Sequence, residues 1–179
     1  MGVAANAVLG AGVIAAATIG IDQASKAYVR GHHHAGVVHD HLGRAADQIP
    51  IVHDFSGTDE VSIVYVENEG MLGGSVTEGS TLASALALPL LPAVGGAVLY
   101  AGASRGASPA MRIASVVGAG LLAGGALSNG VEKLVRGRAT DMLFISRTGT
   151  AWNGADVAIG AGMLVSFGVI GARLVRGMR

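Results

Sequence analysis

The stretch WNGADVAIGAGMLV (residues 152–165) places one acid, Asp156, at the head of a long apolar run. The run continues to about residue 172, and about 20 predominantly apolar residues are enough to cross a bilayer. A carboxyl group beside such a span is energetically costly and indicates a functional site. The stretch therefore predicts a membrane helix whose first turn carries a residue that takes part in the protein's chemistry.

Three further apolar stretches of similar length make the chain a predicted four-span membrane protein. Composition agrees, because 51% of the residues are apolar and only 13% are charged, against about 25% charged residues in soluble domains. Pro89 and Pro92 fall inside the second span, where packed membrane helices tolerate a kink. We expect one membrane domain over residues 1–179. Its four spans cover about residues 3–21, 81–103, 110–131 and 155–172.

The first two spans are separated by the only long polar segment, about residues 29–80, which contains all six histidines and most of the acids. Within it, VSIVYVEN (61–68) has β-branched and aromatic residues in partial alternation, which predicts a short strand. The expected fold is an all-α integral membrane protein with four transmembrane helices. A small extracytoplasmic β-containing element is inserted between helices one and two.

The basic residues give a divided prediction of orientation. The loop between spans two and three and the C-terminal tail carry arginines and no acid, which favours a cytoplasmic side for both. The loop between spans three and four also carries three arginines: Arg136, Arg138 and Arg147. We expect both termini inside, because the large acidic insert is then placed outside.

Four alternating spans would bring the polar residues at their ends to one membrane face. Each has a simple explanation, since Lys26 and Lys133 can snorkel at helix ends, Asn153 can cap a helix and Asp156 suits a helix N-terminus. Capping by Asn153 does not, however, account for an acid three residues later, nor for the gathering of asparagines and acids. The gathered residues are Asp22, Gln23, Ser25, Lys26, Asn68, Asn129, Glu132, Lys133, Asp141, Asn153 and Asp156.

Four segments in order resemble the motifs of the signal peptidase II family, the lipoprotein signal peptidases. The family pattern is D-Q-x-S-K, N-x-G, G-G-A-x-G-N-x-x-D-R with a following V-V-D-F, and F-N-x-A-D at the head of the last helix. The resemblance covers about residues 10–172. The matching segments are DQASK (22–26), VYVENEGMLGG (64–74), GGALSNGVEKLVRGRATDM (124–142) and WNGADVAIGAG (152–162).

The resemblance implies a membrane-embedded aspartic protease that removes the signal peptide from prolipoproteins just before a diacylglyceryl-modified Cys. By motif, Asp141 and Asp156 are the catalytic pair, and no cofactor or metal is needed. The partners implied are lipid-modified prolipoproteins and membrane lipid, and we expect a monomer in the bacterial inner membrane, with its site near the extracytoplasmic face. Supporting or substrate-binding positions are Asp22, Lys26, Asn68, Gly70, Asn129, Glu132, Lys133 and Asn153.

The chain departs from the family pattern at several of these positions. Ser128 replaces a Gly, and Glu132-Lys133 replaces D-R, which keeps the charge signs but loses the guanidinium fork. ATDM (139–142) replaces V-V-D-F, and Trp152 replaces a Phe. Because both presumed catalytic aspartates remain, the sequence favours an active enzyme.

Two other functions stay open at this point. One is an inactive relative that binds lipopeptides without cleaving them. The other is a small membrane protein that binds a metal through the imidazoles of GHHHAGVVHDHLGRAADQ (31–48), although these histidines are equally consistent with a solvated loop. The absence of Cys excludes disulfides and thiol catalysis, and a net charge of zero gives no indication of nucleic-acid binding.

Overall fold

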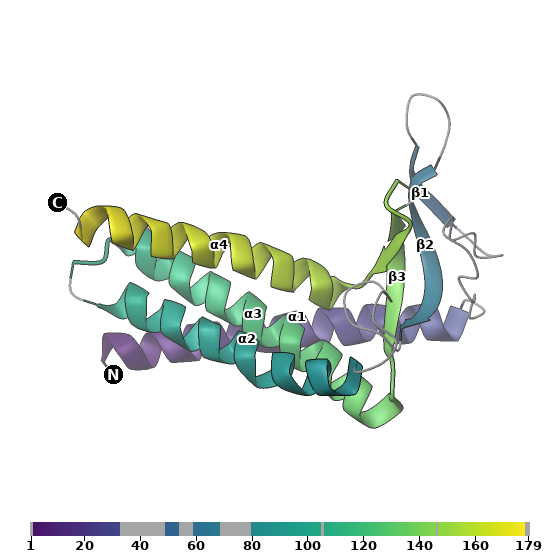
Figure 1. Ribbon diagram of the computed structural model, residues 1–179, viewed down its shortest axis with the longest axis horizontal. Helices are drawn as coiled ribbons and strands as arrows, with labels where there is room; N and C mark the ends of the chain where they lie inside the picture. Colours follow the sequence, from purple (N-terminus) through teal and green to yellow (C-terminus); the bar gives the residue numbers. More distant parts are fainter. Residues whose placement is uncertain are drawn as a thin grey trace.

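Four helices run side by side, and a small sheet lies across one end of them in the computed structural model (Figure 1). Both termini lie at the other end of the bundle. The helices are α1 (Val3–His32), α2 (Ser80–Ala103), α3 (Pro109–Arg136) and α4 (Gly154–Gly177). The structure describes residues 2–32, 49–53, 59–68, 80–104, 106–145 and 147–177.

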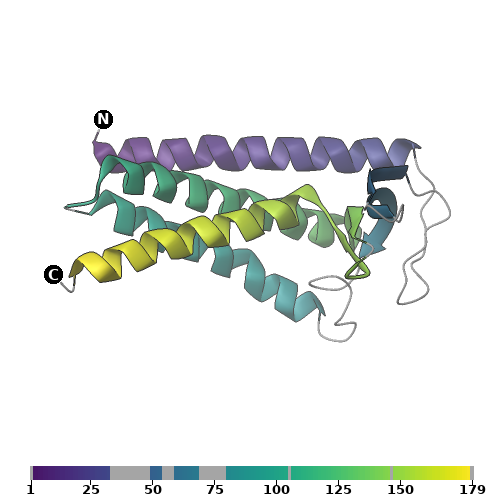
Figure 2. The same cartoon turned by 90° about the horizontal axis from the view of Figure 1, so that it is seen from above.

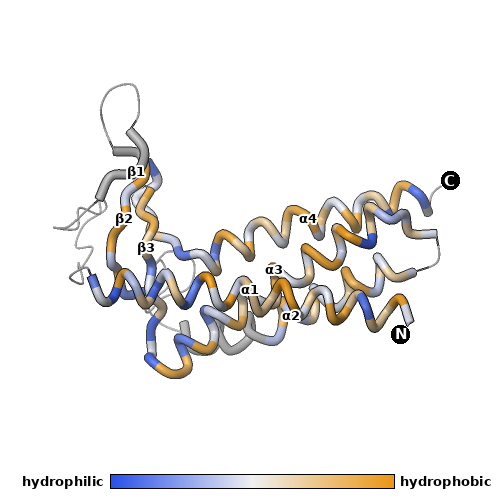
Figure 3. Tube along the Cα trace, turned by 180° about the vertical axis from the view of Figure 1, so that it is seen from behind, coloured by the Kyte–Doolittle hydropathy of each residue, from blue (hydrophilic) through white to orange (hydrophobic). Residues whose placement is uncertain are grey.

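Three of the helices, α1, α3 and α4, are long and apolar enough to cross a membrane. The mostly apolar colouring along the helices in Figure 3 agrees with this. Helix α2 contains Pro89 and Pro92, as expected for the second span. Among the described residues, its apolar part runs only from Pro89 to Ala103, which is too short to cross a bilayer. The protein is therefore a multi-pass membrane protein, and the crossing of the bilayer by α2 stays a prediction.

Helix α1 extends well beyond the predicted end of the first span at residue 21. Its last turns carry Asp22 and Lys26, which are buried against the rest of the protein. The predicted span ends at residue 21 because the apolar run ends at the first charged residue. The helix itself continues, because its charged side chains contact partners on α3. This polar extension brings α1 into the site.

Helix α3 packs against each of the other three helices, and glycines make the approach close. A Cβ atom on Gly124 would lie 2.7 Å from the Cβ of Thr18 on α1, and one on Gly125 would lie 2.5 Å from the carbonyl oxygen of Ala155 on α4. Small residues let membrane helices approach in this way. Seen from above, α3 lies between α1 and α4, which approach each other only towards the end that carries the sheet (Figure 2).

The sheet is antiparallel and has the order β1-β2-β3-β4. Strand β2 confirms the predicted strand at residues 61–68. The prediction that the β element comes from the insert alone is wrong, because β3 and β4 form a hairpin between α3 and α4, with a turn at Gly149 (φ 63°). The strands are β1 (Ile49–His53), β2 (Asp59–Asn68), β3 (Ala139–Ile145) and β4 (Thr150–Trp152).

Candidate active site

The residues singled out by the sequence meet where α3 ends, α4 begins and the sheet joins the bundle. Asp141 comes from β3, Asp156 from the first turn of α4, and Asn153 from the residue before that helix. Asn129 comes from α3, and Asn68 is the last residue of β2. Three asparagines and two aspartates from four elements therefore form one cluster.

Asp141 is buried, at 1% exposure, between two asparagine side chains. Its Oδ1 accepts a hydrogen bond of 2.6 Å from Asn153 Nδ2, and its Oδ2 accepts one of 2.8 Å from Asn68 Nδ2. Next to it the register of β2 and β3 shifts, because Ile63 pairs with Leu143 while Val66 pairs with Asp141. Such a bulge redirects side chains, so the irregular pairing helps to aim Asp141 at the cluster.

The environment of Asp141 favours its protonated form. Burial, and then the negative charge of Asp156, raise the pKa of Asp141 to about 7, while the hydrogen bonds from Asn68 and Asn153 act in the opposite direction. A carboxyl group with this pKa can hold or release a proton near neutral pH. This is the property that a general acid needs.

Asp156 and Asn153 form a reciprocal capping box at the start of α4. Asn153 Oδ1 accepts from the Asp156 backbone N–H at 2.9 Å, and Asp156 Oδ2 accepts from the Asn153 backbone N–H at 3.2 Å. The expectation that capping does not account for an acid three residues later is wrong, because this box uses that position. The Asn153 side chain thus contacts both aspartates, since its Nδ2 also donates to Asp141.

Lys26, from α1, is completely buried beside the cluster. Its Nζ donates to Asn129 Oδ1 at 2.6 Å and forms ion pairs with Asp22 Oδ2 at 2.7 Å and Glu132 Oε2 at 2.9 Å. Because Lys26 occupies the amide oxygen of Asn129, the amide nitrogen points to Asp156 Oδ1, to which it donates at 2.8 Å. Lys26 is therefore a structural residue of the cluster and not a snorkelling one.

Asp22 anchors the first turn of α4 to α1. Its Oδ1 accepts from the Ala155 backbone N–H at 2.8 Å, and its Oδ2 accepts from Ser128 Oγ at 2.7 Å. Gln23 Nε2 in turn donates to Ser128 Oγ at 2.9 Å. The hydroxyl at position 128, where the family pattern has Gly, is thus fully used within this network.

The remaining candidate residues lie in different surroundings. Glu132 is buried and contacts Arg30, Arg136 and Thr140 as well as Lys26. Lys133 is half-buried on α3, where the charges of Asp141 and Asp156 act on it. Gly70 and residues 33–48 of the histidine-rich segment lie outside the described residues, so their proposed roles stay predictions.

Sequence reasoning missed three members of this region, Arg30, Arg136 and Thr140. A partial signal exists, because Glu132 and Arg136 have the i,i+4 spacing at which opposite charges pair on a helix. Within the described part of the chain, no group of three or more histidines and acids is arranged to hold a metal ion.

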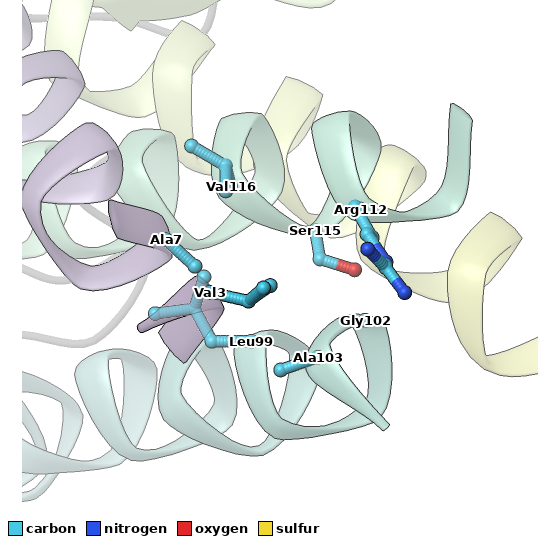
Figure 4. Close-up of a pocket in the computed structure, with 8 residues that line it drawn as sticks. All are labelled: Val3, Ala7, Leu99, Gly102, Ala103, Arg112, Ser115 and Val116. Atoms are coloured by element: carbon cyan, nitrogen blue, oxygen red, sulfur yellow. The ribbon is translucent and has the colours of Figure 1, made fainter. Parts of the chain in front are cut away.

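A small cavity lies at the opposite end of the bundle, between α1, α2 and α3 (Figure 4). Its volume is about 20 Å³, and among the described residues its lining is apolar apart from Ser115 and Arg112. No carboxyl group lies among the described residues that line it.

Comparisons with known proteins concern the chain as a whole. The chain is similar to two bacterial membrane enzymes solved by the in meso method, one at 2.3 Å resolution and one at 1.9 Å. Both share 17% identity with it; the TM-scores are 0.61 and 0.63, with coverage of 90% and 93% of this chain and 84% and 92% of theirs. No curated protein matches the sequence. The model of the family described as Signal peptidase (SPase) II matches residues 14–170, and the chain therefore belongs to the signal peptidase II family.

Proposed function

We propose that the protein is an aspartic endopeptidase that removes the signal peptide from diacylglyceryl-modified prolipoproteins just before the lipidated Cys. Membership of a family of membrane peptidases supports the reaction class. The observation that carries the proposal is the Asn153 side chain, which donates to Asp141 and accepts from the backbone of Asp156. It holds two carboxyl-bearing residues beside each other at one end of the bundle.

The two carboxyl groups divide the work of hydrolysis. Two close carboxyls share one proton, because both do not easily ionise together. Asp141, with its raised pKa, holds the proton and donates it to the carbonyl oxygen of the scissile bond. Asp156 accepts a proton from the attacking water, which adds to the carbonyl carbon. Asp156 then gives this proton to the leaving amine, and Asp141 recovers its own as the carbonyl re-forms.

The surroundings of the site suit a substrate that carries acyl chains. Exposed apolar side chains occur on the parts of α3 and α4 that carry Asn129 and Asp156, namely Val131 and Leu134 on α3 and Val157 on α4. These residues would face lipid, so the acyl chains can stay in the bilayer while the peptide bond reaches Asp141. We infer that α2 completes four spans, that both termini are cytoplasmic and that the site is near the outer face of the bacterial inner membrane.

The proposal is tested with purified protein in lipid, a lipidated precursor and mass spectrometry. We expect the precursor to lose the mass of its signal peptide, with and without chelator. Asp141→Asn and Asp156→Asn should each abolish the loss, while the matched Asp59→Asn on β2 should retain it. Processing by either site variant would refute the pair. Binding of the precursor without cleavage by the wild type would establish the lipopeptide-binding relative instead, and loss of cleavage in chelator would establish a metal-dependent reaction.

A further inference from the structure

A second buried polar cluster adjoins the proposed catalytic pair and has no role in the proposed hydrolysis. Its centre is Glu132, which is 5% exposed. Glu132 Oε1 accepts from Arg30 at 2.8 Å, from Arg136 at 2.9 Å and from Thr140 Oγ1 at 2.8 Å. The backbone N–H of Thr140 donates to the same oxygen at 3.3 Å. One carboxylate oxygen therefore joins α1, α3 and β3.

Thr140 is the partner of Glu132 that lies closest to the site. It is completely buried and directly precedes Asp141 on β3. Its hydroxyl oxygen also accepts from Arg30 and from Arg136, each at 3.0 Å. The Thr140 side chain is thus held by one acceptor and two cationic donors, which leaves this point of the strand little freedom to shift.

The pair coincides with two departures of the chain from the family pattern. Glu132 stands where the pattern has Asp, and Thr140 stands where it has Val. The longer acid and the added hydroxyl occupy the two ends of one hydrogen bond, which a Val at position 140 could not form. The two changes are therefore complementary in structure.

Strand β2 is also held by ion pairs, at the residue that lies opposite Thr140. Glu67 pairs with Thr140 in the register of β2 and β3, and its carboxylate binds Arg138 at 2.6 Å and Arg136 at 3.4 Å. Arg136 thus connects the strand that carries Asn68 with the strand that carries Asp141. The two hydrogen bonds that the Asp141 carboxyl group accepts, from Asn68 and Asn153, depend on where these strands lie.

We propose that Glu132 and Thr140 form a positioning pair that sets the place of the Asp141 carboxyl group relative to Asn68 and Asn153. The inference rests on the proposed function, because it concerns the acid of that reaction. Neither residue touches substrate. The pair acts by fixing β3 to the ends of α1 and α3, so that the carboxyl group reaches both amides.

The test compares Thr140→Val, which keeps the shape and removes the hydroxyl, with Thr140→Ser, which keeps the hydroxyl. We expect Thr140→Val to lower kcat by on the order of tenfold, since small displacements of catalytic groups reduce rates strongly, with little change in KM. Weaker bonds from the asparagines should also move the alkaline limb of the kcat profile to higher pH. Thr140→Ser should keep kcat and the pH profile close to those of the wild type.

Ser166→Ala is the matched control, because it also removes a buried hydroxyl, on α4 and away from the site. A Thr140→Val enzyme with a lower melting temperature but the kcat and pH profile of the wild type would show a purely structural role and overturn the proposal. If the wild type itself does not cleave the lipidated precursor, the proposed function fails instead. The two failures are therefore distinct.

A double-mutant cycle checks that the two residues act together. Glu132→Asp and Thr140→Val should each reduce kcat, and the double variant should lose little more than the worse single variant, because the shared hydrogen bond can be lost only once. Reductions that multiply in the double variant would contradict a pair.

Discussion

Replacement of Lys26 by Met should destabilise the protein strongly, although it removes only a single buried charge. The Lys26 side chain is completely buried and holds two carboxylates, those of Asp22 and Glu132, together with the amide of Asn129. Methionine has a similar length but cannot donate, so both acids lose a cation at once. Truncating one partner of a buried ion pair costs about 3–5 kcal/mol.

The lower end of that range applies here, because both acids keep other donors. Asp22 retains Ser128 and the Ala155 N–H, while Glu132 retains Arg30 and Arg136. We therefore expect a loss of about 3 kcal/mol, which is on the order of a hundredfold in the unfolding equilibrium constant.

Equilibrium unfolding in micelles by a denaturing detergent measures this loss, with Arg112→Met as the control. Arg112 is an exposed cation at the other end of the bundle, so its loss should leave the unfolding free energy nearly unchanged. Asp22→Asn should then cost less in the Lys26→Met background than in the wild type, because its counter-ion is already gone. A Lys26→Met protein within about 1 kcal/mol of the wild type would refute the reasoning that the buried network stabilises the fold.

Three further predictions follow from the same geometry. The kcat of precursor cleavage should fall as the pH rises through about 7, because the pKa of Asp141 lies there and its protonated form is the proposed acid. A rate that is flat from pH 6 to 9, measured by mass spectrometry, would exclude that role. Asn153→Ser keeps a capping oxygen but loses the amide that donates to Asp141, so cleavage should drop by on the order of tenfold or more while the melting temperature changes little. A loss of activity accompanied by a clear fall in melting temperature would instead indicate that Asn153 acts only as a helix cap. Gly125→Ala should destabilise the protein by about 1–3 kcal/mol, because its Cβ would lie 2.5 Å from the Ala155 carbonyl, whereas Gly160→Ala on α4, with nothing within 4 Å, should be neutral or stabilising in the same unfolding assay.

The sequence predicts the parts of this fold that depend on long apolar runs. Three helices confirm predicted spans, and the polar ends of α1, α3 and α4 meet as alternating spans require. Asp141 and Asp156 could be paired only through the motifs, since no single helix or strand brings positions 141 and 156 together. Their proximity depends on the β3–β4 hairpin, which local pattern did not predict.

The hairpin escaped prediction for a physical reason. ATDMLFI (139–145) has no polar alternation, because β3 is buried on both faces for most of its length. Its identity as a strand comes from pairing with β2, which lies far away in the chain. Likewise Thr140 looks unremarkable in sequence, and only the fold shows that its hydroxyl meets Glu132 and two arginines.

Because of the capping box at the start of α4, retention of Asp156 and retention of Asp141 in a related chain do not indicate peptidase activity equally strongly. Asp156 accepts from the backbone N–H of Asn153, so a relative that had lost its peptidase activity would still gain helix stability by retaining this acid. Asp141 lies on β3 and caps no helix, and its burial, which raises its pKa, costs folding free energy at neutral pH. If Asp141 is the acid of the proposed reaction, its retention among related chains is therefore the stronger sign of a working enzyme.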